Sequence, residues 1–307
     1  MILMTRKPRI AVVGSLNMDL VITMQRMPRM GESMQGDDIH YISGGKGANQ
    51  AVGCAKLGAD VSMIGAVGDD GFGAQILDRM NGFGVGTETI AVLADVPTGT
   101  ATILHTEGDN CIVVVPGANG KCTPDQIQAL TSIISGADAL IVQLEIPLPA
   151  VETALRIARE AGVRTIVNPA PAAALTDEQI GLGDYFTPNE TEFEFFCGAS
   201  AETEEALFQQ MHEWKKRFPQ QTLIVTRGKH GISCLAGDQI VTVPAPIVSV
   251  VDTTGAGDSF NAALCFGLAS GWDLERTLPL AVKAASHSVT VFGAQDGMPS
   301  MTDLEQA

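Results

Sequence analysis

The sequence of 307 residues lacks the features that mark disulfide-rich, zinc-binding, membrane-spanning and secreted proteins. Its six cysteines form no CxxC pair and have no spacing typical of metal ligands, so neither a disulfide framework nor a zinc site is expected. No apolar run reaches the roughly 18–20 residues that a membrane span requires. The start, MILMTRKPRI, does not have the form of a signal peptide. We therefore expect a cytoplasmic protein whose thiols are reduced.

Basic residues are also scarce: 19 Lys and Arg stand against 35 Asp and Glu, which gives a net charge of −16. Nucleic-acid backbones and anionic membrane surfaces both require clustered positive charge, so neither is an expected partner. A small anionic ligand is still compatible with this charge, because a few local amides and cations outweigh a distant field. The hydrophobic fraction of 45% is typical of a globular protein.

Strand-like and helix-like segments alternate along most of the chain. Continuous apolar runs such as RIAVVGSL, DVSMIGAVG and ADALIVQLE are typical of strands buried on both faces. Amphipathic segments such as VETALRIAREAG and EEALFQQMHEWKKRF lie between such runs and indicate helices. This alternation predicts one α/β domain over residues 1–307, with a mostly parallel central sheet and helices on both faces.

Two regions, at about residues 16–40 and 95–117, are strand-like without helices between them. The second contains TATILHTEGDNCIVVVP, which reads as a hairpin turning at EGDN. The simplest packing brings the two regions together as a small antiparallel sheet beside the main domain.

Polar residues follow most of the predicted strands, and ligands of such folds bind beyond the carboxyl ends of the strands. Each group on its own is also compatible with an ordinary turn, because Asn and Asp favour turns. Seven groups at strand ends together favour a site. They are Asn17 and Asp19, Gly44 to Asn49, Glu145, Asn168, Asn189 to Glu192, Thr226 to Lys229, and Asp252 to Asp258.

Two familiar nucleotide motifs are absent. GGKGANQ is not a dinucleotide-binding fingerprint, because Gln50 stands where that motif needs its last glycine and the segment does not follow the first strand directly. No GxxxxGK[ST] occurs anywhere in the sequence, so there is no P-loop. A dinucleotide-dependent oxidoreductase, which would share the α/β sheet, therefore has no motif to support it.

The stretch VDTTGAGDSF carries the strongest chemical signal. Gly255, Ala256 and Gly257 can present bare backbone amides at a helix N-terminus, where amides and helix dipole attract anions. Asp258 follows them directly. A helix cap alone would explain Asp258 but not the two glycines. An anion-stabilising turn with a carboxylate that accepts a proton explains both, and phosphoryl transfer to a hydroxyl needs these two parts.

The chain resembles the phosphofructokinase-B-type sugar kinases, or ribokinase-like family, over nearly its whole length. The motifs that carry the resemblance are GSLNMDLV, GGKGANQA, VGDDGFG, TGTA, GAN, QLEIP, NPAPA, TPNETE, VTRG and DTTGAGDSFNAAL. NMD, QLE and NPAPA resemble the ribose-phosphorylating branch more than the kinases of fructose phosphates or nucleosides. The resemblance implies ATP-dependent phosphorylation of D-ribose at its primary hydroxyl. Two alternatives stay open: a kinase for another sugar such as 2-deoxyribose, and a non-catalytic sugar-binding regulator.

The resemblance also implies roles for single residues. Asp258 would be the catalytic base, and the amides of Gly255, Ala256 and Gly257 would stabilise the transferred phosphoryl group. The positions that match sugar contacts are Asn17, Asp19, Gly45, Lys46, Asn49 and Glu145, together with Asp258. Those that match nucleotide contacts are Asn189, Thr226, Arg227, Gly228 and Gly257.

Metal ions and a partner chain are implied in the same way. Asn189 and Glu192 would organise Mg²⁺ through water, and Asp252 and Thr254 match ligands of a K⁺ site. Members of the family commonly have a serine after GAQ where this chain has Gly297, which weakens the expected K⁺ response. Val282 stands where an Asn or His often lies near the adenine, which leaves the preferred phosphate donor open. The two strand-like regions, at about residues 16–40 and 95–117, match the lid that covers the sugar in the family, and this lid is expected to form a homodimer contact.

Overall fold

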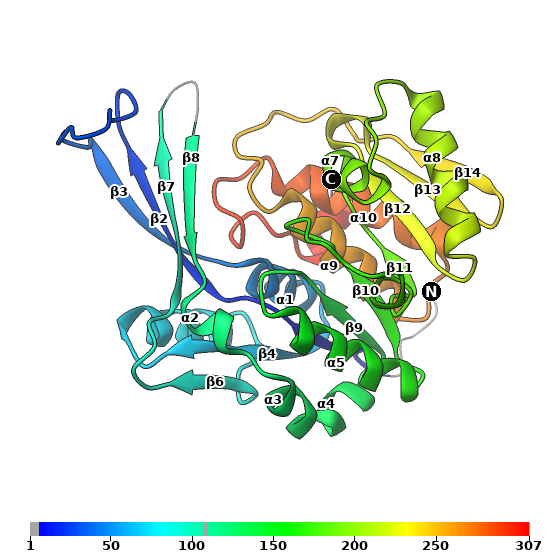
Figure 1. The fold of residues 1–307 in the computed structure, drawn as a ribbon, viewed down its shortest axis with the longest axis horizontal. Coiled ribbons are helices and arrows are strands. Elements are labelled where there is room, and N and C mark those ends of the chain that lie inside the picture. Colours follow the sequence, from blue (N-terminus) through cyan, green and yellow to red (C-terminus); the bar gives the residue numbers. More distant parts are fainter. Residues whose placement is uncertain (1–5, 107–109, 307) are drawn as a thin grey trace.

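The computed structural model describes residues 6–106 and 110–306. Its larger sheet contains β1 (Arg9–Val13), β4 (Asp60–Gly68), β5 (Val85–Gly86), β6 (Ile90–Leu93), β9 (Ala139–Val142), β10 (Arg164–Val167), β11 (Tyr185–Phe186), β12 (Thr222–Thr226), β13 (Ile232–Ala236) and β14 (Gln239–Val243). The strand order is β14-β13-β12-β11-β10-β9-β1-β4-β5, with β6 paired to β4 (Figure 1). Among these pairs only β12–β13 and β13–β14 are antiparallel. The predicted mostly parallel sheet is therefore confirmed.

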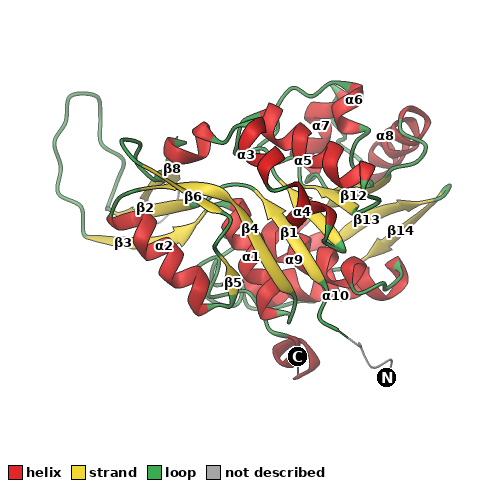
Figure 2. Ribbon diagram, turned by 90° about the horizontal axis from the view of Figure 1, so that it is seen from below, coloured by secondary structure: helices red, strands yellow, loops and turns green. Residues whose placement is uncertain are grey.

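Helices cover both faces of this sheet, as predicted (Figure 2). They are α1 (Lys46–Lys56), α2 (Gly71–Gly82), α3 (Pro124–Ala129), α4 (Thr131–Ser135), α5 (Leu148–Glu160), α6 (Asp177–Ile180), α7 (Glu190–Cys197), α8 (Glu204–Arg217), α9 (Ala256–Ala269), α10 (Leu274–Ser288) and α11 (Met301–Gln306), with short 3₁₀ helices η1 (Gly117–Lys121) and η2 (Gly228–His230).

The period of two along β1 assigns its side chains to the two layers. Ile10 and Val12 pack in one apolar cluster with residues of α1, α9 and α10. Ala11 and Val13 pack in the other, with residues of α5, α7 and α8. All four side chains are at most 1% exposed, which is why this strand reads as a continuous apolar run rather than an alternating one.

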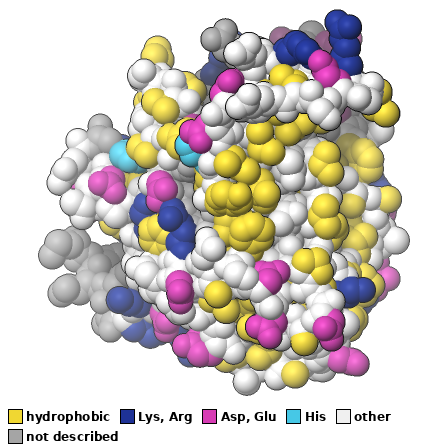
Figure 3. Space-filling view, turned by 90° about the vertical axis from the view of Figure 1, so that its left-hand side faces the viewer, with side chains coloured by type: hydrophobic (Ala, Val, Ile, Leu, Met, Phe, Trp, Pro, Cys, Tyr) yellow, Lys and Arg dark blue, Asp and Glu magenta, His cyan; other side chains and the backbone are white. Residues whose placement is uncertain are grey.

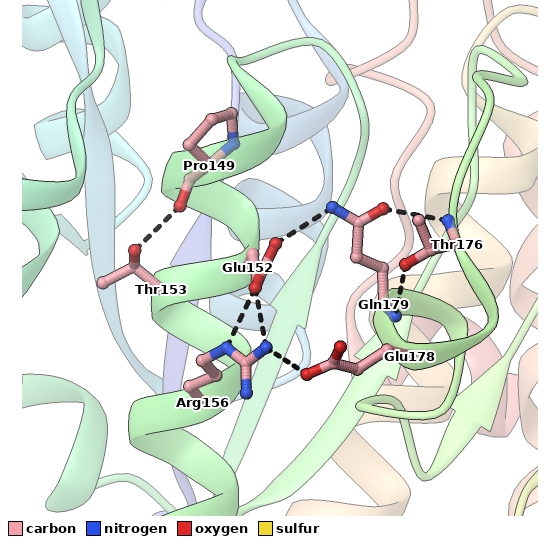
Figure 4. Close-up of polar contacts among 7 residues, drawn as sticks. All are labelled: Pro149, Glu152, Thr153, Arg156, Thr176, Glu178 and Gln179. Carbon is pink, nitrogen blue, oxygen red and sulfur yellow. Dashed lines mark hydrogen bonds and ion pairs between the residues drawn. The ribbon is translucent and has the colours of Figure 1, made fainter.

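Short helices are fixed by capping rather than by long apolar faces. At α6, Thr176 and Gln179 form a reciprocal capping box. Gln179 also donates to Glu152 of α5, whose neighbour Arg156 bridges Glu152 and Glu178 (Figure 4). The ion pairs are exposed and add little free energy, but together with the part-buried Gln179–Glu152 hydrogen bond they hold α6 against α5.

A second, smaller sheet has the order β3-β2-β7-β8. Its strands are β2 (Asn17–Thr23), β3 (Asp38–Gly44), β7 (Gly99–His105) and β8 (Asn110–Val115). The predicted hairpin is present as the antiparallel pair β7–β8, and residues 107–109 of its expected EGDN turn lie outside the described residues. The expectation of an antiparallel sheet was wrong in one respect: β2 and β7 run parallel. The chain between these strands passes through the main domain and returns in the same direction.

The four-stranded sheet stands beside the main domain and is continuous with it, since β2 follows β1 after three residues and β3 runs directly into α1 (Figure 1). Residues at the roots of β2 and β3 are therefore next to the carboxyl end of β1. In the described part of the chain, every helix falls short of the length and apolar character needed to cross a bilayer.

Candidate active site

The glycines of GGKGANQ let the start of α1 pack against the chain leaving β1. Gly45 has φ +88°, and a Cβ there would lie 2.8 Å from the amide nitrogen of Asn17. A Cβ on Gly47 would lie 2.6 Å from the amide nitrogen of Ser15. Neither position has room for a side chain, so these glycines bring Lys46 and Asn49 to the edge of the sheet where β1 ends.

The second glycine-rich turn opens α9. Gly255 has φ +80°, and a Cβ there would lie 2.8 Å from the Cβ of Ala294, so both conformation and packing require glycine. A Cβ on Gly257 would meet no atom within 4 Å. Gly257 is thus not required by packing, and its bare backbone is open to a ligand. The Ala256 amide donates to the Thr253 carbonyl at 3.3 Å within this turn.

Asp258 lies in the first turn of α9 and is 6% exposed. Its Oδ2 accepts a hydrogen bond from Asn49 Nδ2, and its Oδ1 accepts one from Gln50 Nε2, both at 2.9 Å. The carboxylate predicted as the base is therefore held by two consecutive residues of α1. The two glycine-rich motifs, about 210 residues apart in the sequence, meet at this point.

Lys46 lies among carboxylates at the centre of the site. Burial lowers the pKa of Lys46, but the charges of Asp258, Glu145, Glu192 and Asp19 raise it more, so that the net pKa lies above its ordinary value. Lys46 is therefore positively charged at neutral pH. The structure brings together side chains from four of the predicted groups around one ammonium.

Asn17 and Asp19 both lie on β2 and share one face of it, as their spacing predicts. Burial, followed by the charges of Glu145 and Asp258, raises the pKa of Asp19 to about 7, against an opposing effect of Lys46. Asp19 is thus a carboxylate whose charge depends on pH near neutrality.

Two buried residues fix the neighbouring polar groups. Asn119 of η1 donates from Nδ2 to Asn17 Oδ1 at 2.7 Å and accepts from the Leu16 amide at 2.9 Å. Ser15 donates from Oγ to Glu145 Oε2, which also accepts from the Lys46 amide at 3.1 Å. These contacts fix the orientations of the Asn17 side chain and of the Glu145 carboxylate.

A cavity of about 600 Å³ adjoins the start of α9. Its lining includes Thr226, Gly228, Ala256, Gly257 and Val282, so three predicted nucleotide-bordering positions and Val282 face one space. Most other lining side chains are apolar, among them Ile232, Ala245, Val250, Phe260, Ala285 and Val289. An apolar cavity that ends at open backbone amides suits a ligand with a flat apolar end and an anionic end.

The side chain of Arg227 is already paired. Its guanidinium lies 2.6 Å from Glu204, 3.5 Å from Glu190 and 3.1 Å from the Ser233 hydroxyl. It is therefore turned toward the starts of α7 and α8. Its predicted contact with the nucleotide stays a prediction, and it would involve the backbone of the turn rather than the guanidinium.

Asn189 and Glu192, predicted to organise Mg²⁺, form a reciprocal capping box at α7. Asn189 Oδ1 accepts from the Glu192 amide at 2.8 Å, and Glu192 Oε2 accepts from the Asn189 amide at 2.9 Å. Burial raises the pKa of Glu192. No cluster of three His, Cys, Asp or Glu side chains that would hold a metal occurs among the described residues. This donor set fits Mg²⁺ only as an outer carboxylate, with phosphates and water supplying most ligands.

Asp252, predicted for K⁺, bridges two backbone segments. Its Oδ1 accepts from the Thr254 amide at 2.9 Å, and its Oδ2 accepts from the Gly293 amide at 3.0 Å. At Gly297 a Cβ would lie 2.6 Å from the Ser288 carbonyl oxygen, so a serine side chain has no room here. The donors fit a cation only in part, because both oxygens of Asp252 already accept hydrogen bonds from backbone amides.

Sequence reasoning missed several buried amides and a hydroxyl that support the predicted residues. They are Ser15, Gln50, Asn119, Gln143 and Gln295, each at most 1% exposed. Four of them stand inside motifs that were recognised, and that position was their only signal: Ser15 in GSLNMDLV, Gln50 in GGKGANQA, Asn119 in GAN and Gln143 in QLEIP. Gln295 lies outside those motifs, and its partner Asn49 is too distant in sequence to be inferred.

Comparison with known proteins gives one consistent result. Residues 7–301 match the sequence profile of a protein family described as "pfkB family carbohydrate kinase". A ribokinase of Bacillus subtilis is 42% identical over 97% of this chain and 98% of its own, and a deoxyribokinase of Salmonella typhi is 32% identical over 97% of both. A solved structure of Arabidopsis thaliana ribokinase complexed with ribose and ATP has a TM-score of 0.90 at 31% identity and covers 98% of each chain.

Proposed function

Because this chain belongs to the pfkB family of carbohydrate kinases, we propose that it transfers the terminal phosphoryl group of ATP to the primary hydroxyl of D-ribose. The products are D-ribose 5-phosphate and ADP. One observation carries the proposal: Asp258, a buried carboxylate at the start of α9, lies between an open glycine turn and a polar cluster. That position puts a proton acceptor where an acceptor hydroxyl and a transferred phosphoryl group would meet.

The polar cluster supplies the acceptor side. Five polar side chains converge here from β2, α1 and the end of β9: Asn17, Asp19, Asn49, Glu145 and Lys46. Carboxylates accept from adjacent hydroxyls, and amides both donate and accept, so the cluster suits a molecule with several hydroxyls. Asp258 takes the proton of the hydroxyl that attacks. Holding that hydroxyl against the carboxylate is the main contribution of these side chains to the rate.

The charge of the cluster indicates a neutral acceptor. Four carboxylates, from Asp19, Glu145, Glu192 and Asp258, act on the single ammonium of Lys46. A sugar that already carries a phosphate would meet net repulsion here. Neutral sugars therefore fit better than sugar phosphates, and a phosphorylated product is not retained by this cluster.

The cavity beside α9 supplies the donor side. Its apolar lining receives the base of ATP, and the amides of Gly255 and Gly257 stabilise the negative charge of the transferred group. The Ala256 amide, which was predicted to take part as well, already donates to the Thr253 carbonyl. Mg²⁺, when bound with the nucleotide, neutralises phosphate charge, and Glu192 contributes an outer carboxylate to it. K⁺ binding at Asp252 and Thr254 belongs to the same proposal.

The four-stranded sheet acts as a lid, and its exposed strand forms a homodimer contact. On β8, Ile112, Val113, Val114 and Val115 are between 49% and 57% exposed. Apolar side chains gather on the face of the molecule that carries this sheet (Figure 3). An apolar edge strand with free backbone groups is prone to aggregate unless it is covered, and a second copy would cover it. The cytoplasm is the proposed location, where its six free thiols stay reduced.

A coupled assay of ADP release with a panel of sugars tests the function. D-ribose should exceed 2-deoxy-D-ribose by at least ~10-fold in kcat/KM, because an unpaired buried carboxylate costs about 1.5–3 kcal/mol. Ribose 5-phosphate should give no turnover as acceptor. A preference for 2-deoxyribose, or no turnover with either pentose, would overturn the choice of ribose but not the kinase class. Sugar binding without any turnover would favour a non-catalytic regulator.

A further inference from the structure

Gln50 is a fully buried glutamine beside the proposed base. It follows Asn49 on α1 and is 0% exposed. Its Nε2 donates to Asp258 Oδ1 at 2.9 Å and to Asn168 Oδ1 at 2.9 Å, so both amide hydrogens are used. Because no part of Gln50 is accessible, it has no surface with which to contact sugar or nucleotide.

The partners of Gln50 fix the orientation of its amide. Its Oε1 accepts a hydrogen bond from Nε2 of Gln143, which is also 0% exposed. An ionised Asp258 only accepts hydrogen bonds, so the NH₂ end of Gln50 must face it and the oxygen must face Gln143. Gly14 packs directly on the Gln143 amide, so that a Cβ on Gly14 would collide with its Oε1. Both side chains are 0% exposed, so the Gln50–Gln143 pair is enclosed by protein.

The other oxygen of Asp258, Oδ2, is held by a similar pair of hydrogen-bonded amides. Asn49 Nδ2 donates to Oδ2, and Asn49 Oδ1 accepts from Gln295 Nε2 at 3.2 Å. Each carboxylate oxygen is thus held by an amide that is itself held by a buried glutamine. The two supports differ in one respect: Asn49 is expected to contact the sugar, whereas Gln50 contacts only protein.

We propose that Gln50 is a positioning residue for catalysis, which holds the carboxylate of Asp258 at the angle from which it accepts the hydroxyl proton. This inference rests on the proposed function. The carboxylate stands on two rotatable bonds, and Asn49 alone fixes one oxygen but not the rotation about it. Without Gln50 the second oxygen is free to turn. A displacement of about 1 Å at a reacting group costs on the order of 10²-fold in rate.

The variant Gln50→Met tests this, with Gln221→Met as its matched control. Gln221 is also a buried glutamine whose amide is used fully: it accepts from Trp214 Nε1 and donates to the carbonyls of Ile180 and Gly183. Both substitutions remove the same group from the interior, so both should lower the melting temperature. Only Gln50→Met touches Asp258.

For Gln50→Met we expect kcat to fall about 10- to 100-fold, with KM for ribose and for ATP within about three-fold of wild type. Gln221→Met should keep kcat. The proposal is overturned if folded Gln50→Met keeps its kcat within about three-fold, if its KM values change as much as kcat, or if Gln221→Met loses kcat equally.

Gln50→Asn decides the question if Gln50→Met does not fold. Asparagine keeps an amide in the interior, but its side chain is one methylene shorter and should no longer reach Asp258 Oδ1, which Gln50 Nε2 contacts at 2.9 Å. We expect kcat to fall at least about 10-fold, and a wild-type kcat would overturn the proposal. The wild-type assay distinguishes failure of the proposed function from failure of this inference. A wild type without sugar kinase activity would overturn both. An active wild type with an unaffected Gln50→Met would overturn the inference alone.

Discussion

The carboxylate of Asp19 occupies the space beside Gly44 that a side chain would otherwise fill. A Cβ built on Gly44 would lie 2.7 Å from Asp19 Cγ and closer still to Oδ2. The two residues lie on the neighbouring strands β2 and β3, whose register pairs Asn17 with Gly44. Glycine at position 44 is therefore a condition for Asp19 to reach the candidate sugar site.

Gly44→Ala should displace Asp19 and weaken the binding of sugar. Loss of a hydrogen bond to a charged group costs about 1.5–3 kcal/mol, so KM for ribose should rise about 10- to 100-fold, while KM for ATP changes little. Steady-state kinetics with each substrate varied in turn measures this. Gly82→Ala is the control, since a Cβ there meets nothing within 4 Å. An unchanged KM for ribose in Gly44→Ala would show that Asp19 does not contact the sugar.

Asp19 also predicts a pH-dependent stability. Its pKa is raised to about 7 in the folded state, first by burial and then by Glu145 and Asp258, from an ordinary value of 3.8. Between these two values the folded state binds the extra proton. The stabilisation that this proton provides is therefore complete below about pH 4 and is lost as the pH rises through about 7.

Asp19→Asn, which is neutral at every pH, should therefore melt at a higher temperature than wild type at pH 8, with a smaller difference at pH 5. Thermal unfolding at both pH values measures this, with the exposed Asp78→Asn as control. The same variant should lose sugar affinity, because an amide cannot accept from two hydroxyls as a carboxylate does. A difference in melting temperature that does not grow between pH 5 and pH 8 would contradict the raised pKa.

The main fold was predictable because its signals are local. Strand β1 is apolar at every position that faces either layer, Gly14 follows its last residue, and Gly45 marks the turn that opens α1. The parallel pairing of β2 with β7 was not predictable, since the path of the chain between them decides it. Helix α7 was missed because Asn189 and Glu192 were interpreted as ligands and a turn, although the same two residues also form a capping box.

The candidate site was predictable only in part, for a similar reason. Residues within a motif, such as Asn49 and Asp258, were recognised one by one. Their mutual contact joins positions 209 residues apart, and the contact of Gln50 with Gln143 joins positions 93 apart. Such contacts depend on the tertiary structure, and a single sequence does not contain them.

Asp258→Asn tests the proton acceptor. We expect kcat to fall roughly 10²–10⁴-fold, the contribution of a positioned general base, with little change in KM for ribose. An asparagine amide also presents a donor to either Asn49 or Gln50, so thermal unfolding must first show that the variant is folded. Turnover near that of wild type would leave Asp258 as a residue of the helix start without a role in proton transfer.

The lid contact predicts a dimer that one charge would disrupt. Val113 is 57% exposed on β8 and pairs with Thr102, which places it on the face of the sheet opposite Asp19. Val113→Lys should shift the protein toward monomer in analytical ultracentrifugation. Val241→Lys, on the exposed edge strand β14 and 45% exposed in wild type, is the control and should not. A monomeric wild type, or a Val113→Lys protein that stays dimeric, would contradict this contact.

The last prediction concerns K⁺. Asp252 ties the Thr254 amide and the Gly293 amide together beside the anion-stabilising turn, so a cation bound there would act by ordering the turn rather than by touching the phosphate. Gly297 offers no side-chain ligand, and the nearby Ser288 carbonyl leaves no room for one. We therefore expect K⁺ to raise kcat over Na⁺ by only about five-fold, near the lower end of typical couplings between sites.

Rates in KCl, NaCl and tetramethylammonium chloride at equal ionic strength measure this, and Asp252→Ala should abolish the difference. Equal wild-type rates in K⁺ and tetramethylammonium would remove Asp252 and Thr254 from the functional residues. A difference that persists in Asp252→Ala would place the cation elsewhere.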